Sequence, residues 1–137
     1  MDRNQILIPV LAQVSLTIIV FAMLARAKAA AAARGEVDPE RRALHDDAWP
    51  DSVLKISNNI RNQFETPVLF YVLALTIWGL DAVDVTALAL AWAFFATRVV
   101  HVFVHTGANV VPIRRRVFTL GVATLLLLVI RAAVALA

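Results

Sequence analysis

Four long apolar stretches, separated by short polar segments, dominate this chain and limit the folds that it can adopt. They lie at about residues 6–25, 58–80, 82–104 and 117–136. A helix needs roughly 20 residues to span a bilayer, so each stretch is long enough for one crossing. Hydrophobic residues make up 61% of the 137 residues, more than in an ordinary soluble domain. Four helices of roughly 20 residues use most of the chain and leave no room for a separate soluble domain. The sequence predicts an all-α, integral membrane four-helix bundle, one domain over residues 1–137 with helices at about 5–34, 52–80, 82–106 and 113–136.

The distribution of cations predicts how these helices are oriented in the membrane. Lysines and arginines gather between the first and second stretches, and Arg114 to Arg116 lie between the third and fourth. The middle connection carries only Asp81 and Asp84. The positive-inside rule then predicts both termini outside and the first and third connections in the cytoplasm. The short, alanine-rich chain favours a bacterial inner membrane. The apolar helices predict the lipid bilayer as a partner. Nucleic acid is not a predicted partner, because the membrane topology already explains where the cations lie.

The second stretch begins with polar residues that an apolar helix does not need. Only 15 residues run from Thr66 to Leu80, so part of the preceding polar run must enter the membrane. Asn58, Asn62 and Glu65 are spaced to share one helix face, and Arg61 stands four residues before Glu65, where the two can pair. Two interpretations are open. Arg61 can reach lipid headgroups with Glu65 neutralised beside it, or the run can form a buried polar site.

The third stretch ends in a similar polar face. Arg98, His101 and His105 are spaced i, i+3 and i+7 on one helix. Two histidines four residues apart can bind a metal, but no third or fourth ligand is evident, so we predict no metal site. The loop residues His45, Asp46 and Asp47 are adjacent and do not converge on one ion. Hydrogen bonds between helices or contacts with a ligand are the favoured roles for the α-helical histidines.

Both polar groups lie on the predicted cytoplasmic side and can meet at one depth. Together with Arg114 they would suit an anionic ligand that forms hydrogen bonds, because arginine binds carboxylates in a fork and amides bind peptide groups. A basic loop beside anionic headgroups is the competing explanation for the three consecutive arginines, and it is favoured for Arg115 and Arg116. The chain has no cysteine, so any thiol chemistry must use a thiol from the substrate.

These residues carry a resemblance to a known family. The order Arg61-Asn62-x-x-Glu65 with Pro67, followed by Arg98-x-x-His101, Gly107, Pro112 and Arg114, resembles the MAPEG family, the membrane-associated proteins in eicosanoid and glutathione metabolism. Within that family, the pattern is most similar to the microsomal prostaglandin E synthases and glutathione transferases. The resemblance covers the whole four-helix plan, and its specific motifs lie in two segments.

The resemblance implies a homotrimer with glutathione bound between neighbouring subunits near the cytoplasmic face. It implies a glutathione-dependent transferase or peroxidase that acts on a lipophilic small-molecule substrate. Arg114 matches the arginine that stabilises the glutathione thiolate in catalytic members. The implied glutathione-binding residues are Arg61, Asn62, Glu65, Arg98, His101 and His105, with Asn58 at the same face and Arg26 at the end of the first helix.

Three departures from the family pattern keep other functions open. Asn58 stands where catalytic members usually carry an arginine, and His105 and Phe118 stand where tyrosines are expected. A non-catalytic membrane protein on the same scaffold, which binds an anionic ligand or lipid, is therefore the main alternative to an enzyme. A small four-helix drug exporter is a weaker one, since its carboxylate usually lies in the first helix and Glu65 lies in the second stretch.

Overall fold

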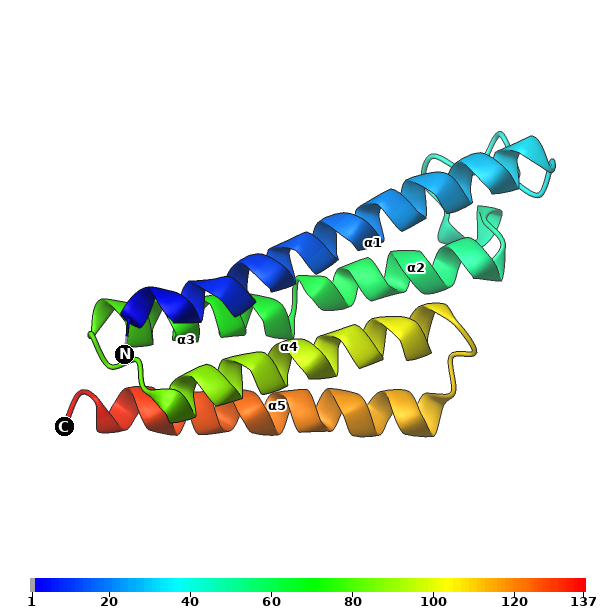
Figure 1. The fold of residues 1–137 in the computed structure, drawn as a ribbon. Helices are drawn as coiled ribbons and strands as arrows, with labels where there is room; N and C mark the ends of the chain where they lie inside the picture. Colours follow the sequence, from blue (N-terminus) through cyan, green and yellow to red (C-terminus); the bar gives the residue numbers. More distant parts are fainter. Residues whose placement is uncertain (1) are drawn as a thin grey trace.

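The structure, a computed structural model, describes residues 2–137 and contains only helices and their connections in that range. A short 3-10 turn, η1 (Arg3–Ile6), leads into the first long helix, and a second one, η2 (Asp46–Ala48), lies in the long connection that follows. The five α-helices are α1 (Leu7–Ala33), α2 (Asp51–Gln63), α3 (Thr66–Gly79), α4 (Val85–Thr106) and α5 (Val111–Val134). Figure 1 shows α2 and α3 following one another alongside α1, with α4 and α5 paired beneath them. Both termini lie at one end, opposite the α1–α2 and α4–α5 connections (Figure 1).

The predicted continuous helix at 52–80 is wrong, because the chain breaks at Phe64 and Glu65. In an unbroken helix the nitrogen of Pro67 would donate to the carbonyl of Gln63. Proline has no N–H and its ring collides with that carbonyl, so a helix stops before it. Pro67 instead occupies the first turn of α3, where a missing N–H costs nothing. The second of the four segments is therefore two helices in succession, α2 and α3.

The other three helices agree closely with their predicted ranges and are long and apolar enough to cross a membrane. α1 ends just before Gly35, which has a φ of 69°, and the N–H of Glu36 donates to the carbonyl of Ala31 at 3.0 Å. α4 begins at Val85 rather than 82 because the Asp84 side chain accepts from the N–H of Ala87 at 2.8 Å and caps the helix.

The interior of the bundle is apolar in one half and contains both apolar and polar side chains in the other. Near the termini, Phe70 of α3 stacks on Phe94 of α4 with ring centroids 4.7 Å apart, and small residues such as Ala74 and Ala91 pack around them. Towards the opposite end, a smaller apolar cluster of Val20, Ile56 and Val102 lies among buried polar side chains. These polar side chains are Gln13, Asn59, Gln63, Thr66, Arg98, His101 and His105. Buried polar groups are costly unless they are hydrogen-bonded, and ionisable residues inside a membrane usually serve a function. This half of the bundle is therefore the first place to look for a functional site.

Candidate functional site

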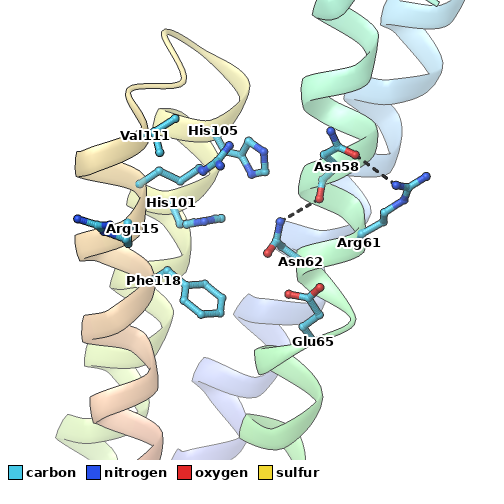
Figure 2. A pocket seen from close by; sticks show the side chains of 10 residues that line it. Asn58, Arg61, Asn62, Glu65, His101, His105, Val111, Arg115 and Phe118 are labelled. Carbon is cyan, nitrogen blue, oxygen red and sulfur yellow. Dashed lines mark hydrogen bonds between the residues drawn. The ribbon is translucent and has the colours of Figure 1, made fainter. Parts of the chain in front are cut away.

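A pocket of about 500 Å³ opens between α2 on one side and α4 and α5 on the other. Figure 2 shows its two facing walls, with the amides of α2 opposite the histidines of α4. A volume in this range is typical of sites for small organic ligands. Seven of the nine residues proposed from the sequence line it, namely Asn58, Arg61, Asn62, Glu65, His101, His105 and Arg114. Three others complete the lining: Val111, Arg115 and Phe118.

On the α2 wall of the pocket, the predicted pairing of Arg61 with Glu65 is not formed. Arg61 donates to Asp46 at 2.5 Å and to Asn58 at 3.5 Å, and it forms no ion pair with Glu65. Because α2 ends at Gln63, Glu65 leaves the i, i+4 register and takes a φ of −99° and a ψ of −97°. Figure 2 shows its carboxylate turned towards the gap between the walls. Glu65 has no ion-pair partner among residues 2–137.

Asn62 and Asn58 remain neighbours on the same wall. The side-chain amide of Asn62 donates to the backbone carbonyl of Asn58 at 3.0 Å, which holds it one turn below Asn58 (Figure 2). The second hydrogen of that amide and its carbonyl oxygen stay available to a ligand.

The wall from α4 is built on the predicted Arg98, His101 and His105 face, and all three side chains are buried. The two imidazoles lie edge to face with centroids 5.3 Å apart. Arg98 does not line the pocket; it lies deeper, donates to Nδ1 of His101 at 3.3 Å, and faces the Phe118 ring at 6.0 Å. Its Nε has no hydrogen-bond partner in the described part of the chain. Arg98 therefore supports the wall from behind.

Arg114 is held by a residue that sequence reasoning missed. Asn109, in the turn between α4 and α5, accepts from Nη1 of Arg114 at 2.7 Å. Asn109 has a φ of 52°, a left-handed conformation that asparagine tolerates better than most residues. An asparagine between Gly107 and the Pro112 helix start is the sequence signal that could have identified it. Lys55 of α2 also donates to the carbonyl of Gly107 at 3.4 Å, so the turn is attached to the opposite wall.

A second set of missed residues forms a buried chain of amides behind the pocket. Gln13 of α1 donates to Gln63 at 2.9 Å, Gln63 donates to Asn59 at 3.1 Å, and Asn59 contacts Nδ1 of His105 at 3.3 Å. Asn59 and Gln63 lie one position after the predicted Asn58 and Asn62. Their spacing from the apolar Ile56 would have placed them, rather than their neighbours, on the buried face of α2.

Arg26 does not join the pocket within one chain. It lies on an exposed face of α1, while its neighbours Met23, Leu24 and Ala27 pack on the bundle. Met23, Leu24 and Ala27 lie on the face of α1 that packs on the bundle, and the helix geometry places Arg26 on the outer face. Residues 2–137 also contain no group of three or more histidines and acids close enough to hold a metal ion.

The loop that follows α1 is exposed but ordered by ion pairs. Asp46 holds Arg61, and Asp47 accepts two hydrogen bonds from Arg41 at 2.8 and 3.0 Å. The hydrogen bond from Arg41 lowers the pKa of Asp47 below its ordinary value. This loop thus has a structural role, because its Asp46 pairs with Arg61, which lines the pocket.

The lining combines an excess of positive charge with fixed hydrogen-bond donors. The lining includes three arginines, Arg61, Arg114 and Arg115, and one carboxylate, Glu65. Such a site favours a ligand with several anionic oxygens, for which arginine is the best-shaped partner, and Glu65 can accept from an ammonium group on the same ligand.

Comparison with known proteins agrees with this architecture at the level of the family. A family model described as the MAPEG family matches residues 6–134, nearly the whole chain. No curated protein and no solved structure gives a match, so the similarity to prostaglandin E synthases or glutathione transferases in particular stays a prediction. The match spans all four membrane segments and both halves of the pocket, and the chain belongs to the MAPEG family.

Proposed function

We propose that this protein is a membrane-embedded, glutathione-dependent transferase or peroxidase that acts on lipophilic electrophiles. The observation that carries the proposal is the pocket, which gathers Arg61, Asn62 and Glu65 on one wall and Arg114 on the other in a member of the MAPEG family. Glutathione has two carboxylates, one ammonium group and two peptide groups. The arginines, Glu65 and the amides of Asn58 and Asn62 match these groups in charge and in hydrogen-bonding character.

Arg114 is the proposed catalytic residue. A thiol with a pKa near 8.5 is mostly protonated at neutral pH, and the thiolate is the nucleophile. A guanidinium beside the sulfur stabilises the thiolate, and the hydrogen bond from Arg114 to Asn109 at 2.7 Å limits where the guanidinium can lie. In the transferase reaction the thiolate forms a carbon–sulfur bond and the electrophile loses its leaving group. In the peroxidase reaction the thiolate attacks the peroxide and takes up one oxygen as a sulfenic acid, while the other oxygen is protonated and leaves as the alcohol. A second glutathione then attacks that sulfur, forms the disulfide and releases the oxygen as water.

The membrane supplies the second substrate in this proposal. An apolar electrophile concentrates in the bilayer and reaches the thiolate from the lipid side, so the protein brings two reactants together at one depth. From the distribution of cations we propose that the pocket lies on the cytoplasmic side and both termini outside, and from the short, alanine-rich chain that the membrane is a bacterial inner membrane. We further propose a homotrimer, in which Arg26 of one subunit approaches the pocket of its neighbour.

The test is a titration of the purified protein in lipid nanodiscs with glutathione, followed by calorimetry and by ultraviolet thiolate absorbance. Binding, and a thiolate that persists at neutral pH, support the proposal. The Arg114→Ala variant should still bind glutathione and lose the thiolate signal. The matched control is Arg116→Ala, an arginine two residues away that does not line the pocket. Absence of heat and of thermal stabilisation at millimolar glutathione would reject the proposal.

A non-catalytic protein that binds an anionic ligand is the second candidate. Arg61 is engaged by Asp46, and Phe118 contributes an apolar ring to the lining, so the pocket has fewer free polar groups than the motif alone suggests. Glutathione binding without turnover of any electrophile or peroxide, and with no thiolate signal, would favour this candidate.

A further inference from the structure

The buried amide chain behind the pocket ends on a ring that faces the ligand space. Gln13, Gln63 and Asn59 are all completely buried or nearly so, with exposed fractions of 0%, 1% and 0%. They connect α1 through α2 to Nδ1 of His105 on α4. His105 lines the pocket, and its Nε2 has no hydrogen-bond partner among the described residues. The amide chain therefore contacts Nδ1 of His105 and leaves Nε2 without a partner among residues 2–137.

The neighbouring histidine shows how such a contact selects a tautomer. A neutral imidazole has one donor nitrogen and one acceptor nitrogen, while a guanidinium can only donate. Arg98 donates to Nδ1 of His101 at 3.3 Å, so this nitrogen carries no proton and Nε2 does. The N–H of His101 is thereby directed away from Arg98.

For His105 the direction of the amide chain decides the tautomer. Each amide can donate or accept, so the chain has two consistent directions. In one direction every amide donates one N–H towards His105, which leaves unmet the carbonyl oxygen of Gln13 and one N–H of each amide. In the other direction the two N–H bonds of the Gln13 amide are left buried without an acceptor. Unmet buried N–H groups are rarer in proteins than unmet carbonyls, so the first direction is favoured.

We propose that Asn59 and Gln63 are positioning residues that hold His105 as a neutral donor, with Nδ1 accepting from Asn59 and the Nε2–H free for a ligand oxygen. His101, held in the same tautomer by Arg98, supplies a second donor, and the two rings are 5.3 Å apart. Two donors set by buried partners need little reorganisation when a ligand binds. They select for a ligand group with acceptor oxygens, such as a carboxylate, over one that is itself a donor.

This inference rests on the proposed function for the identity of the ligand, but the tautomer can be tested without any ligand. The protein has three histidines, so nitrogen NMR of ¹⁵N-histidine-labelled protein in nanodiscs can be assigned with His45→Gln and His101→Gln variants. We expect His105 to show a protonated Nε2 and an unprotonated Nδ1 in the unliganded protein. A protonated Nδ1 would overturn the proposal, and this measurement requires no substitution of Gln13, Gln63 or Asn59.

Variants of Asn59 test the cause. In Asn59→Asp the carboxylate can only accept, so Nδ1 of His105 should become protonated. In Asn59→Leu the ring should lose its single tautomer. The matched control is Asn58→Leu, the same substitution at the neighbouring position outside the amide chain, which should leave the His105 signals unchanged. Identical His105 signals in the wild type, Asn59→Asp and Asn59→Leu would overturn the positioning role.

Glutathione binding separates the failure of this inference from the failure of the proposed function. If glutathione binds, Asn59→Leu should weaken binding by about tenfold, which corresponds to one hydrogen bond. Unchanged binding in that variant, with an altered tautomer, would overturn the role of His105 as a ligand donor. If the wild type binds no glutathione, the proposed function fails, while the NMR spectra still decide whether the amide chain sets the tautomer.

Discussion

Arg61 of α2 donates to Asp46 of the preceding loop at 2.5 Å and leaves Glu65 unpaired, although the sequence places Glu65 four residues after it. Both partners are largely exposed, each with 63% of its side chain accessible. An exposed ion pair is weak, so a multiply charged anion can compete for Arg61. The loop thus controls how much of the Arg61 charge is available at the rim of the pocket.

The first prediction concerns this ion pair. Replacing Asp46 with asparagine should free Arg61 and strengthen the binding of an anionic ligand by a few-fold, with a steeper dependence on salt. Calorimetric titrations with glutathione at two salt concentrations would measure both effects. Asp47→Asn is the control, because Asp47 pairs with Arg41 and not with a pocket residue. Weaker binding in Asp46→Asn would show that the loop, rather than the freed charge, supports the ligand.

The second prediction concerns the Asn109 contact with Arg114. Asn109→Gly keeps the left-handed backbone but removes the acceptor at 2.7 Å, so Arg114 should lose its fixed position. Thiolate formation and turnover should fall by about tenfold, while the melting temperature changes little. Asn109→Asp retains an acceptor oxygen and should preserve most of the activity. Equal activity in Asn109→Gly and the wild type would remove Asn109 from the site.

The third prediction concerns the pH dependence of stability at the opposite end of the bundle. Asp84 caps α4 through Ala87 and accepts from Arg131 at 3.0 Å. The hydrogen bond from the Ala87 N–H, followed by that from Arg131, lowers the pKa of Asp84. Its pKa is thus lower in the folded than in the unfolded state, so the stabilisation is complete above the unfolded pKa of about 4. It is lost as the pH falls through the lower, folded value.

Asp84→Asn can still cap the helix and should show less of this acid sensitivity. Asp84→Ala should cost about 1 kcal/mol of stability at neutral pH through the lost cap. Thermal unfolding in detergent between neutral and acidic pH would measure both. The same acid sensitivity in Asp84→Asn and the wild type would assign it to other carboxylates.

The fourth prediction concerns the contact between α4 and α5. A Cβ on Gly121 would lie 3.0 Å from Oγ1 of Thr97 and 3.9 Å from the Phe94 ring, whereas one on Gly79 meets nothing within 4 Å. Gly121→Val should destabilise the bundle by about 1–3 kcal/mol through overpacking. Gly79→Val, the matched control, should change the stability much less. Similar melting temperatures for the two variants would contradict this packing.

The sequence by itself determined the class of fold and most of the residues that line the pocket. The apolar stretches require membrane helices, because a chain this hydrophobic must satisfy its backbone polar groups internally. The spacing of Arg98, His101 and His105 places them on one face, since the helix period leaves no other arrangement. The break at Pro67 was also readable, because proline cannot continue a helix, although the short apolar run obscured it.

Only the tertiary structure decided which polar side chains face one another. Asn58 and Asn59 differ by one position, and the packing of α2 against α1 and α4 selects which of them is buried. The partner of Arg61 depends on where the long loop folds, and the partner of Arg114 depends on the backbone of the turn at Asn109. Helical periodicity determines which residues share a face, but contacts between elements depend on side-chain packing and loop geometry, which arise only when the chain is folded.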